Sequence, residues 1–162
     1  VDLLIEAVKK VPGLCLHILG TGPMDQSLRK SAGAENNRIF FHGFVIGTKK
    51  IDLLKHALFM VIPSIVYEQF PITALEGMAY GLPLILPEMG GWASTMIGYE
   101  NCVFYRQGDV VDLAEKMQYL LDHEEIANKM AEKGKRLLKE VFSSDQYYQQ
   151  IINFYQLFIS NK

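Results

Sequence analysis

The stretch Pro71–Pro87, PITALEGMAYGLPLILP, sets a short helix before an apolar strand, and it decides the fold class. Proline is favoured in the first turn of a helix, so Pro71 marks the start of a helix that we expect over Ile72–Tyr80. Gly81 follows, and Pro83–Pro87 has the length and composition of a strand buried on both faces. A helix that leads into such a strand is typical of a parallel α/β sheet.

The same alternation of strand and helix extends over most of the chain. Apolar runs with turn residues nearby predict further strands at Leu14–Leu19, Arg38–His42, Phe59–Pro63 and Cys102–Tyr105. Helices are predicted between strands at Pro23–Ser31, at Lys49–Ala57 and in a short segment near Trp92. This order predicts a Rossmann-like, doubly wound parallel sheet with helices on both faces.

The remainder of the chain is predicted to be helical. One helix follows a cap at Asp109, a second opens at the capping-box-like stretch Asp122–Glu125, and the last is capped by Ser143–Gln146. Val1–Gly13 has the pattern of a helix already under way, so we expect the chain to begin inside a larger protein. Together the segments predict one α/β domain over residues 1–162 with a helical C-terminus.

Composition limits the classes of function. With 162 residues and 49% hydrophobic content, the chain can bury a core of its own without disulfides. The net charge of -2 and the absence of a basic block argue against nucleic acid as a partner. No apolar run is long enough to span a membrane, and no signal peptide is recognisable. Cys15 and Cys102 lie in strand-like runs, which predicts buried, reduced thiols.

Candidate ligand-binding residues lie in the loops that follow the predicted strands. These loops are Gly20–Pro23, Gly43–Gly47, Ser64–Pro71 and Glu88–Trp92. Ligands of open α/β sheets bind beyond the carboxyl ends of the strands, and glycine lets the backbone approach a ligand closely. Each loop taken alone is commonly a tight turn, so the prediction depends on their combination.

The helix start at Pro71 provides the most specific chemistry. The N–H groups of Ile72 and Thr73 would be free to bind a phosphate at the positive end of the helix dipole. Glu76 lies about 7 to 8 Å further along the helix, comparable to the distance from a diphosphate to its ribose. Its carboxylate can accept hydrogen bonds from both ribose hydroxyls. Glu68 would face the other end of the ligand. The alternative is that both glutamates are ordinary surface residues.

Several motifs occur in a characteristic order: Leu19–Pro23 (LGTGP), Phe41–Val45 (FHGFV), Tyr67–Ile85 (YEQFPITALEGMAYGLPLI) and Gly90–Gly91. They resemble the C-terminal, donor-binding domain of the retaining GT-B glycosyltransferases, in particular family four (group 1 type), over nearly the whole chain. The resemblance implies one half of a GT-B fold. It also implies a nucleotide-diphospho-sugar donor, no cofactor or metal ion, and hexosyl transfer with retention to a glycan, lipid-linked or small-molecule acceptor in polysaccharide biosynthesis.

The resemblance also implies roles for individual residues. Glu76 matches the ribose-binding glutamate, and Glu68 matches the glutamate that contacts the transferred sugar near its reacting centre. Thr73 matches a phosphate-contacting residue. The remaining donor-binding positions are Gly20, Thr21 and Gly22 at the cleft, Phe44 and Val45 at the nucleobase, Phe70, Pro71 and Ile72 along the sugar and phosphates, and Gly90 and Gly91.

Some expected parts of the family are missing from this sequence. The first strand, the following loop with an Arg and a Lys, and the N-terminal acceptor domain would all precede Val1, so the isolated chain is expected to be inactive. Ser94 stands where the family often has Glu. In this family the last helix often packs across the N-terminal domain, which would leave Tyr147, Tyr155 or Phe158 partly exposed; alternatively, the helix packs on its own core.

Two other functions remain open. One is a non-catalytic sugar-nucleotide-binding or scaffolding domain, and the other is half of a sugar-nucleotide epimerase. A generic dinucleotide-binding domain is disfavoured, because Asp25 stands at the sixth position of GTGPMD where a glycine is required. The family resemblance implies a cytoplasmic protein, with peripheral attachment to the inner face of the cytoplasmic membrane as a further expectation.

Overall fold

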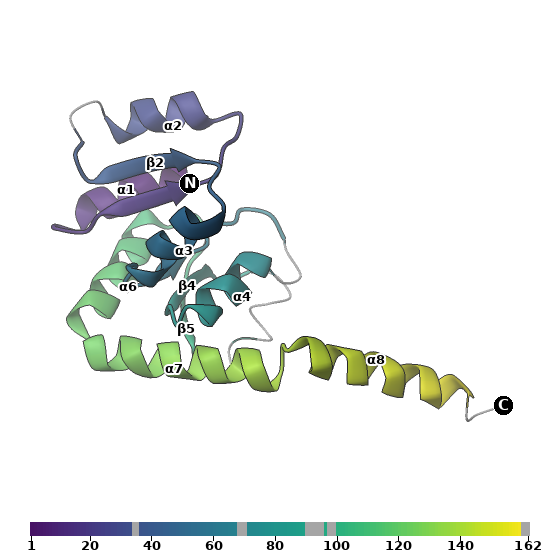
Figure 1. Cartoon of the computed structure of the whole chain (residues 1–162). Helices are drawn as coiled ribbons and strands as arrows, with labels where there is room; N and C mark the ends of the chain where they lie inside the picture. The colour runs from purple at the N-terminus through teal and green to yellow at the C-terminus, as the bar shows by residue number, and fades with distance from the viewer. Residues whose placement is uncertain (34–35, 68–70, 90–95, 97–99, 160–162) are drawn as a thin grey trace.

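The computed structural model describes residues 1–33, 36–67, 71–89, 96 and 100–159 (Figure 1). The described strands are β1 (Leu16–Leu19), β2 (Ile39–Gly43), β3 (Met60–Val61), β4 (Leu84–Pro87) and β5 (Cys102–Tyr105). The described helices are α1 (Asp2–Lys10), α2 (Asp25–Ala32), α3 (Gly47–Lys55), α4 (Ile72–Ala79), α6 (Val110–Asp122), α7 (Glu124–Glu140) and α8 (Ser144–Ile159). Every strand predicted from the sequence is present, although most are shorter than predicted.

The strands form two parallel sheets. β1 pairs with β2, and β4 lies between β3 and β5. Leu16 stands opposite Ile39 in the first sheet, whereas Leu84 stands opposite both Met60 and Cys102 in the second. The predicted parallel α/β class is confirmed. The single doubly wound sheet that the alternation predicts is divided here into a two-stranded and a three-stranded part.

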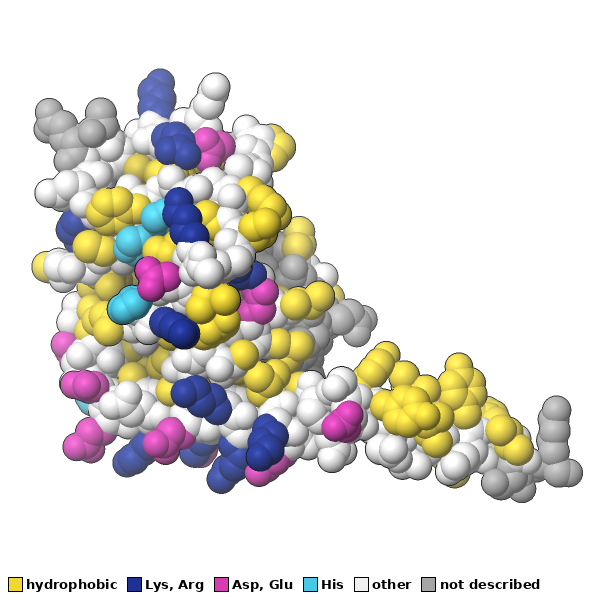
Figure 2. All heavy atoms as spheres, in the orientation of Figure 1, with side chains coloured by type: hydrophobic (Ala, Val, Ile, Leu, Met, Phe, Trp, Pro, Cys, Tyr) yellow, Lys and Arg dark blue, Asp and Glu magenta, His cyan; other side chains and the backbone are white. Residues whose placement is uncertain are grey.

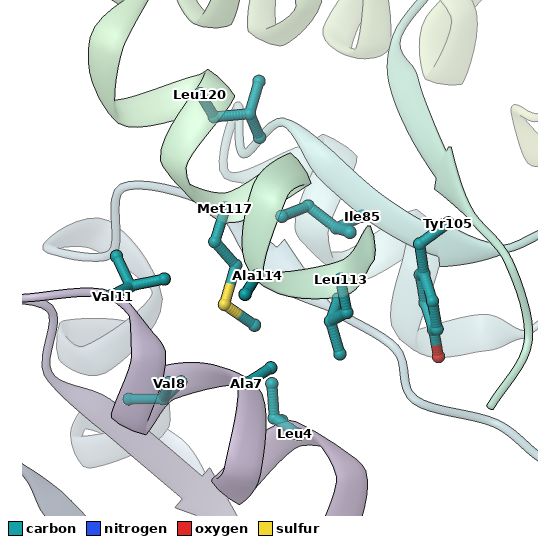
Figure 3. Close-up of a cluster of buried hydrophobic side chains, with 10 residues drawn as sticks. All are labelled: Leu4, Ala7, Val8, Val11, Ile85, Tyr105, Leu113, Ala114, Met117 and Leu120. Carbon is teal, nitrogen blue, oxygen red and sulfur yellow. The ribbon is translucent and has the colours of Figure 1, made fainter. Parts of the chain in front are cut away.

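The main core lies between α1, α6 and the three-stranded sheet. Leu4 and Ala7 of α1 point toward Leu113 and Met117 of α6, with Ile85 of β4 beside them (Figure 3). The side chains of β4 are buried along its whole length, as predicted for an inner parallel strand. A second cluster lies under α4 and α7 and includes Ala74, Met78, Leu84, Leu86 and Leu137.

Two of the three predicted helix caps are confirmed. Asp109 Oδ1 accepts hydrogen bonds from the N–H groups of Val111 and Asp112, both at 3.0 Å, at the start of α6. Ser143 Oγ accepts from the N–H of Gln146 at 3.3 Å at the start of α8. The capping box at Asp122–Glu125 is wrong. α6 runs through Asp122, so His123 is the N-cap residue of α7, and no side-chain cap bond is made there.

The first sheet is open on one face, contrary to the prediction that its strands are buried on both. Leu16 and Ile18 pack toward Ile5, Ala32 and Ile39, while the intervening His17 and Leu19 are exposed. The strict alternation of side chains along a strand explains this pattern, because only one face is covered by α1 and α2.

The two cysteines differ in environment. Cys15, just before β1, is exposed, so the prediction of a buried thiol there is wrong. Its apolar neighbours suggested burial, but its side chain lies on the uncovered side of the sheet. Cys102 in β5 is buried as predicted, and desolvation by burial raises the pKa of its thiol to about 12.

A cavity of about 830 Å³ separates β1 from β3. α1 and α6 contribute Leu4, Val8, Met117 and Leu121 to its lining, and α3 contributes Leu53 and Leu54. Val1 lies at the same cavity. The space is thus lined by residues of α1, α3 and α6 and by the facing edges of the two sheets, and it is partly open to solvent.

The peptide groups of β1 and β3 are directed across this cavity. Leu16 and Gly20 donate their N–H groups toward β2, to Arg38 O and Gly43 O at 2.8 and 2.7 Å. Successive peptide groups of a strand point to opposite edges, so those of His17 and Leu19 face the cavity. On β3, Met60 and Ile62 donate toward β4, at 2.9 and 3.1 Å, which turns the peptide group of Val61 toward the cavity.

The last helix, α8, extends away from the rest of the chain (Figure 1). None of its residues is buried, and hydrophobic side chains cluster along it (Figure 2). Tyr147, Tyr155 and Phe158 are 66%, 61% and 61% exposed. The expectation of exposed rings is confirmed, and the alternative that α8 packs on the domain's own core is wrong. Within the described ranges, no helix is both long and apolar enough to cross a bilayer.

Candidate functional site

The loops after β1 and β2 lie side by side at the carboxyl ends of these parallel strands. Gly20 donates its N–H to Gly43 O at 2.7 Å and has a φ of 126°, a conformation that residues with a Cβ rarely adopt. A Cβ added at Gly43 would lie 3.8 Å from Thr21 Cγ2. Around Gly22 a Cβ would meet no atom within 4 Å, so the backbone there is open to a ligand. Gly20, Thr21 and Gly22 thus occupy the predicted edge of the sheet.

Phe44 and Val45 continue directly from β2. The Phe44 side chain is 76% exposed, while Val45 is partly buried. Ile46, at the N-cap of α3, is 70% exposed as well. An aromatic ring with this much exposed surface beside a glycine loop is available to contact a flat apolar group.

The start of α4 presents backbone N–H groups that have no acceptor within the helix. Pro71 is buried, acts as the N-cap residue, and accepts a hydrogen bond from Ala74 N at 2.9 Å through its carbonyl oxygen. The helix therefore begins at Ile72, as predicted. Ile72 and Thr73 are exposed, and N–H groups in the first turn of a helix have no acceptor within the helix. This end of α4 can bind an anion by geometry and by its dipole.

Glu76 is held by a lysine from another helix. Lys50 Nζ of α3 donates to Glu76 Oε1 at 2.6 Å, and the two side chains are 33% and 35% exposed. Ala74 and Met78 on the same helix are fully buried, which turns Glu76 toward α3 and away from the core. Glu76 is therefore paired with Lys50 and is only partly exposed, while its role toward a ribose stays a prediction. Sequence reasoning missed Lys50, since no local motif marks a residue that is 26 positions away.

Some of the predicted site residues lie within the described residues, and others lie outside them. Glu68, Phe70, Gly90 and Gly91 lie outside the described residues, so their roles stay predictions. The other predicted positions fall at the carboxyl ends of parallel strands or in the first two turns of α4. Lys50 and Glu76 connect these two parts of the site, since α3 follows the β2 loop and α4 follows β3.

The histidines belong to no catalytic arrangement within the described residues. His17 Nδ1 and His42 Nε2 are 2.8 Å apart on the open face of the first sheet. Desolvation by burial is the main cause that lowers the pKa of His42, and electrostatic interactions with His17 and Lys49 are lesser causes. His56 and His123 are the C-cap residues of α3 and α6.

Residues 1–137 match the family described as "Glycosyl transferases group 1". The chain belongs to this glycosyl transferase family. It is 29% identical to the O-antigen chain mannosyltransferase C of Escherichia coli over 164 residues, which covers 99% of this chain and 44% of the relative. It is 30% identical to the D-rhamnosyltransferase WbpZ of Pseudomonas aeruginosa over 130 residues, or 78% of this chain and 34% of the relative. The chain thus spans less than half the length of either transferase.

Solved structures agree on the fold of this glycosyl transferase chain. The sucrose-phosphate synthase from Thermosynechococcus elongatus superposes with a TM-score of 0.83 at 23% identity, over 99% of this chain and 42% of the synthase. Anabaena Alr3699/HepE, solved in complex with UDP, superposes with a TM-score of 0.83 at 20% identity, over 95% of this chain and 44% of its own. The α/β arrangement of parallel strands and helices is therefore that of GT-B glycosyltransferases.

Proposed function

We propose that the full-length protein is a retaining hexosyltransferase and that this chain binds its nucleotide-diphospho-sugar donor. The observation that carries the proposal is the pairing of an exposed helix start, at Ile72 and Thr73, with a fixed carboxylate one turn later at Glu76. The diphosphate would bind the helix start, where N–H groups and the dipole favour negative charge. The ribose hydroxyls would donate hydrogen bonds to Glu76.

The other predicted residues complete the donor site in this proposal. Phe44 and Val45 would contact the nucleobase, and the loop Gly20–Gly22 would border the donor with its open backbone. Glu68 would orient the transferred sugar near its reacting centre, which makes it the candidate catalytic residue. Phe70 and Pro71 would lie along the sugar and phosphates, and Gly90 and Gly91 would approach the donor through their backbone.

The names of similar proteins support a nucleotide-sugar donor and a polysaccharide product. The structures of Alr3699/HepE contain UDP and UDP-glucose, which are a nucleoside diphosphate and its hexose derivative. The Escherichia coli relative is named as a mannosyltransferase of the O-antigen chain. We therefore propose a glycan or lipid-linked acceptor and a role in polysaccharide biosynthesis. A cytoplasmic enzyme, attached peripherally to the inner face of the membrane, would suit such an acceptor.

No metal ion or other cofactor is required in this proposal. The helix start provides the positive electrostatic potential for the diphosphate, together with cationic residues upstream of this chain. Donor binding by the full-length protein should therefore be the same with and without an excess of EDTA.

The cavity between β1 and β3 supports a further strand upstream of Val1. A strand at this position would run parallel to both neighbours and accept and donate hydrogen bonds at His17, Leu19 and Val61. Neighbouring strands lie about 4.8 Å apart, so one strand would join the two sheets into one. α1 would then be the crossover helix of a right-handed βαβ unit that ends in β1. The acceptor domain would precede this strand, and the chain alone would be inactive.

Product analysis tests the proposed reaction. The full-length protein is incubated with UDP-, GDP- and ADP-hexoses and a glycan acceptor, and the new linkage is examined by NMR. We expect one donor to be consumed and the anomeric configuration of its sugar to be kept in the product. Conversion of the donor into an epimeric sugar nucleotide would support the epimerase alternative. Donor binding without turnover would support the non-catalytic one.

A further inference from the structure

Lys50 connects the two helices that border the candidate donor site. Its Nζ lies 2.6 Å from Glu76 Oε1, so the contact is a charge-assisted hydrogen bond between α3 and α4. Most other ion pairs of the described residues lie within one helix or involve a loop. The Lys50–Glu76 pair is therefore a specific link between the nucleobase side and the ribose side of the site.

Stability of the fold does not explain this pair. Both side chains are about one third exposed (33% and 35%). Ion pairs at such positions contribute little, because water screens them and two long side chains lose freedom. α4 is already anchored to the core by Ala74 and Met78, which have no exposed surface.

The pair does fix the position of a hydrogen-bond acceptor. A carboxylate has two oxygens and about four sites that accept hydrogen bonds. Lys50 donates to Oε1, so Oε2 keeps its lone pairs as potential acceptors for a ligand. A glutamate side chain in solution samples many rotamers, and restricting it before a ligand arrives reduces the entropy lost on binding.

We propose that Lys50 is a positioning residue for the donor, which holds the Glu76 carboxylate where the ribose hydroxyls donate to it. This inference rests on the proposed donor site. Lys50 acts through Glu76 and does not touch the transferred sugar. Its loss therefore weakens recognition of the ribose hydroxyls and leaves recognition of the phosphates largely intact.

The preference for ribose over deoxyribose measures this role in the full-length protein. UDP, GDP and ADP are titrated calorimetrically, and the tightest binder is compared with its 2′-deoxy form. A hydroxyl that donates to a carboxylate should give the wild-type protein a preference of about tenfold or more for the ribonucleotide. Lys50→Met should reduce this preference at least about threefold, and Lys50→Arg should restore most of it.

Lys49→Met is the matched control. Lys49 is the preceding residue of α3 and is exposed, so this change removes the same charge without touching Glu76. The preference of Lys49→Met for the ribonucleotide should equal that of the wild type. Lys50→Gln provides a second variant if Lys50→Met does not fold. The preference of Lys50→Gln for the ribonucleotide over its 2′-deoxy form should also be lower than that of the wild type.

The outcomes separate this inference from the proposed function. If Lys50→Met and Lys50→Gln keep the wild-type preference while Glu76→Gln loses it, the role of Lys50 is overturned and the donor site stands. If Glu76→Gln also keeps the preference, or if no diphosphate binds, the donor site itself is wrong and the role of Lys50 falls with it.

Discussion

Gly77 of α4 touches Leu84 of β4 so closely that an added Cβ would lie 2.8 Å from Leu84 Cδ2. The same atom would lie 2.9 Å from Met60 Sδ of β3. Both distances are shorter than real contacts of a Cβ, so the ends of the Leu84 and Met60 side chains would have to shift to accept any residue larger than glycine. The residue beside Glu76 therefore lies at a close contact between the sheet and the helix that carries the proposed ribose contact.

Gly77→Ala should destabilise the protein. Overpacking against Leu84 and Met60 typically costs about 1–3 kcal/mol, and the better helix propensity of alanine returns up to about 1 kcal/mol. We expect a net loss of about 1–2 kcal/mol in the free energy of unfolding, measured by urea denaturation. Gly134→Ala in α7 is the matched control, because its Cβ would lie 3.4 Å from Met78 Cγ, an ordinary contact. Equal stability of the two variants would show that the contact of Gly77 with Leu84 and Met60 can relax without cost in free energy.

Asp109 should make stability depend on pH in the acidic range. Hydrogen bonds from the N–H groups of Asp112 and Val111, with the Arg106 guanidinium, lower the pKa of Asp109 from 3.8 in the folded protein. A carboxyl with a lowered folded pKa stabilises the fold above its unfolded pKa, and this contribution is lost as pH falls through the folded pKa.

Asp109→Asn distinguishes the hydrogen bonds of the cap from the contribution of the negative charge of Asp109. Asparagine also caps helices well but does not titrate, so the variant should melt below the wild type at pH 7 and approach it as pH falls below about 4. Thermal denaturation monitored by circular dichroism at several pH values gives this difference. A gap that stays constant from pH 7 to about pH 3 would contradict the assignment of the cap to the ionised carboxylate.

The cavity between the sheets predicts a difference in hydrogen exchange. In the full-length protein, the amides of His17, Leu19 and Val61 should exchange much more slowly than in the isolated chain, because a strand upstream of Val1 would bond this edge. The amide of Leu86 in β4 is the internal control, since β4 is paired on both sides and should be protected in both proteins. Identical exchange at Val61 in the two proteins would rule out the inserted strand.

Much of the fold could be predicted from local sequence. The run at Pro83–Pro87 identified a buried strand because each of its residues is apolar, and Pro71 identified a helix start because proline has no N–H to satisfy. Asp109 was recognisable as a cap for a similar local reason. These features depend on residues close in the chain, where sequence spacing directly determines geometry.

The features that were missed depend on distant partners. Lys50 and Glu76 lie on separate helices, and no spacing rule connects them. Cys15 stands in an apolar run, but its exposure depends on which face of the first sheet is covered. The gap between β1 and β3 is likewise invisible in an alternation of strands and helices, because alternation does not state which strands are neighbours.

Titration of nucleotide sugars against the full-length protein and its Glu76→Ala variant tests the central claim most directly. We expect one of UDP-glucose, GDP-mannose and ADP-glucose to bind selectively. We expect Glu76→Ala to weaken this binding by about tenfold or more, since hydrogen bonds to a charged group are lost. Thermal denaturation of the variant checks that it is folded. Absence of binding at millimolar donor, or unchanged affinity in folded Glu76→Ala, would contradict the proposed donor site.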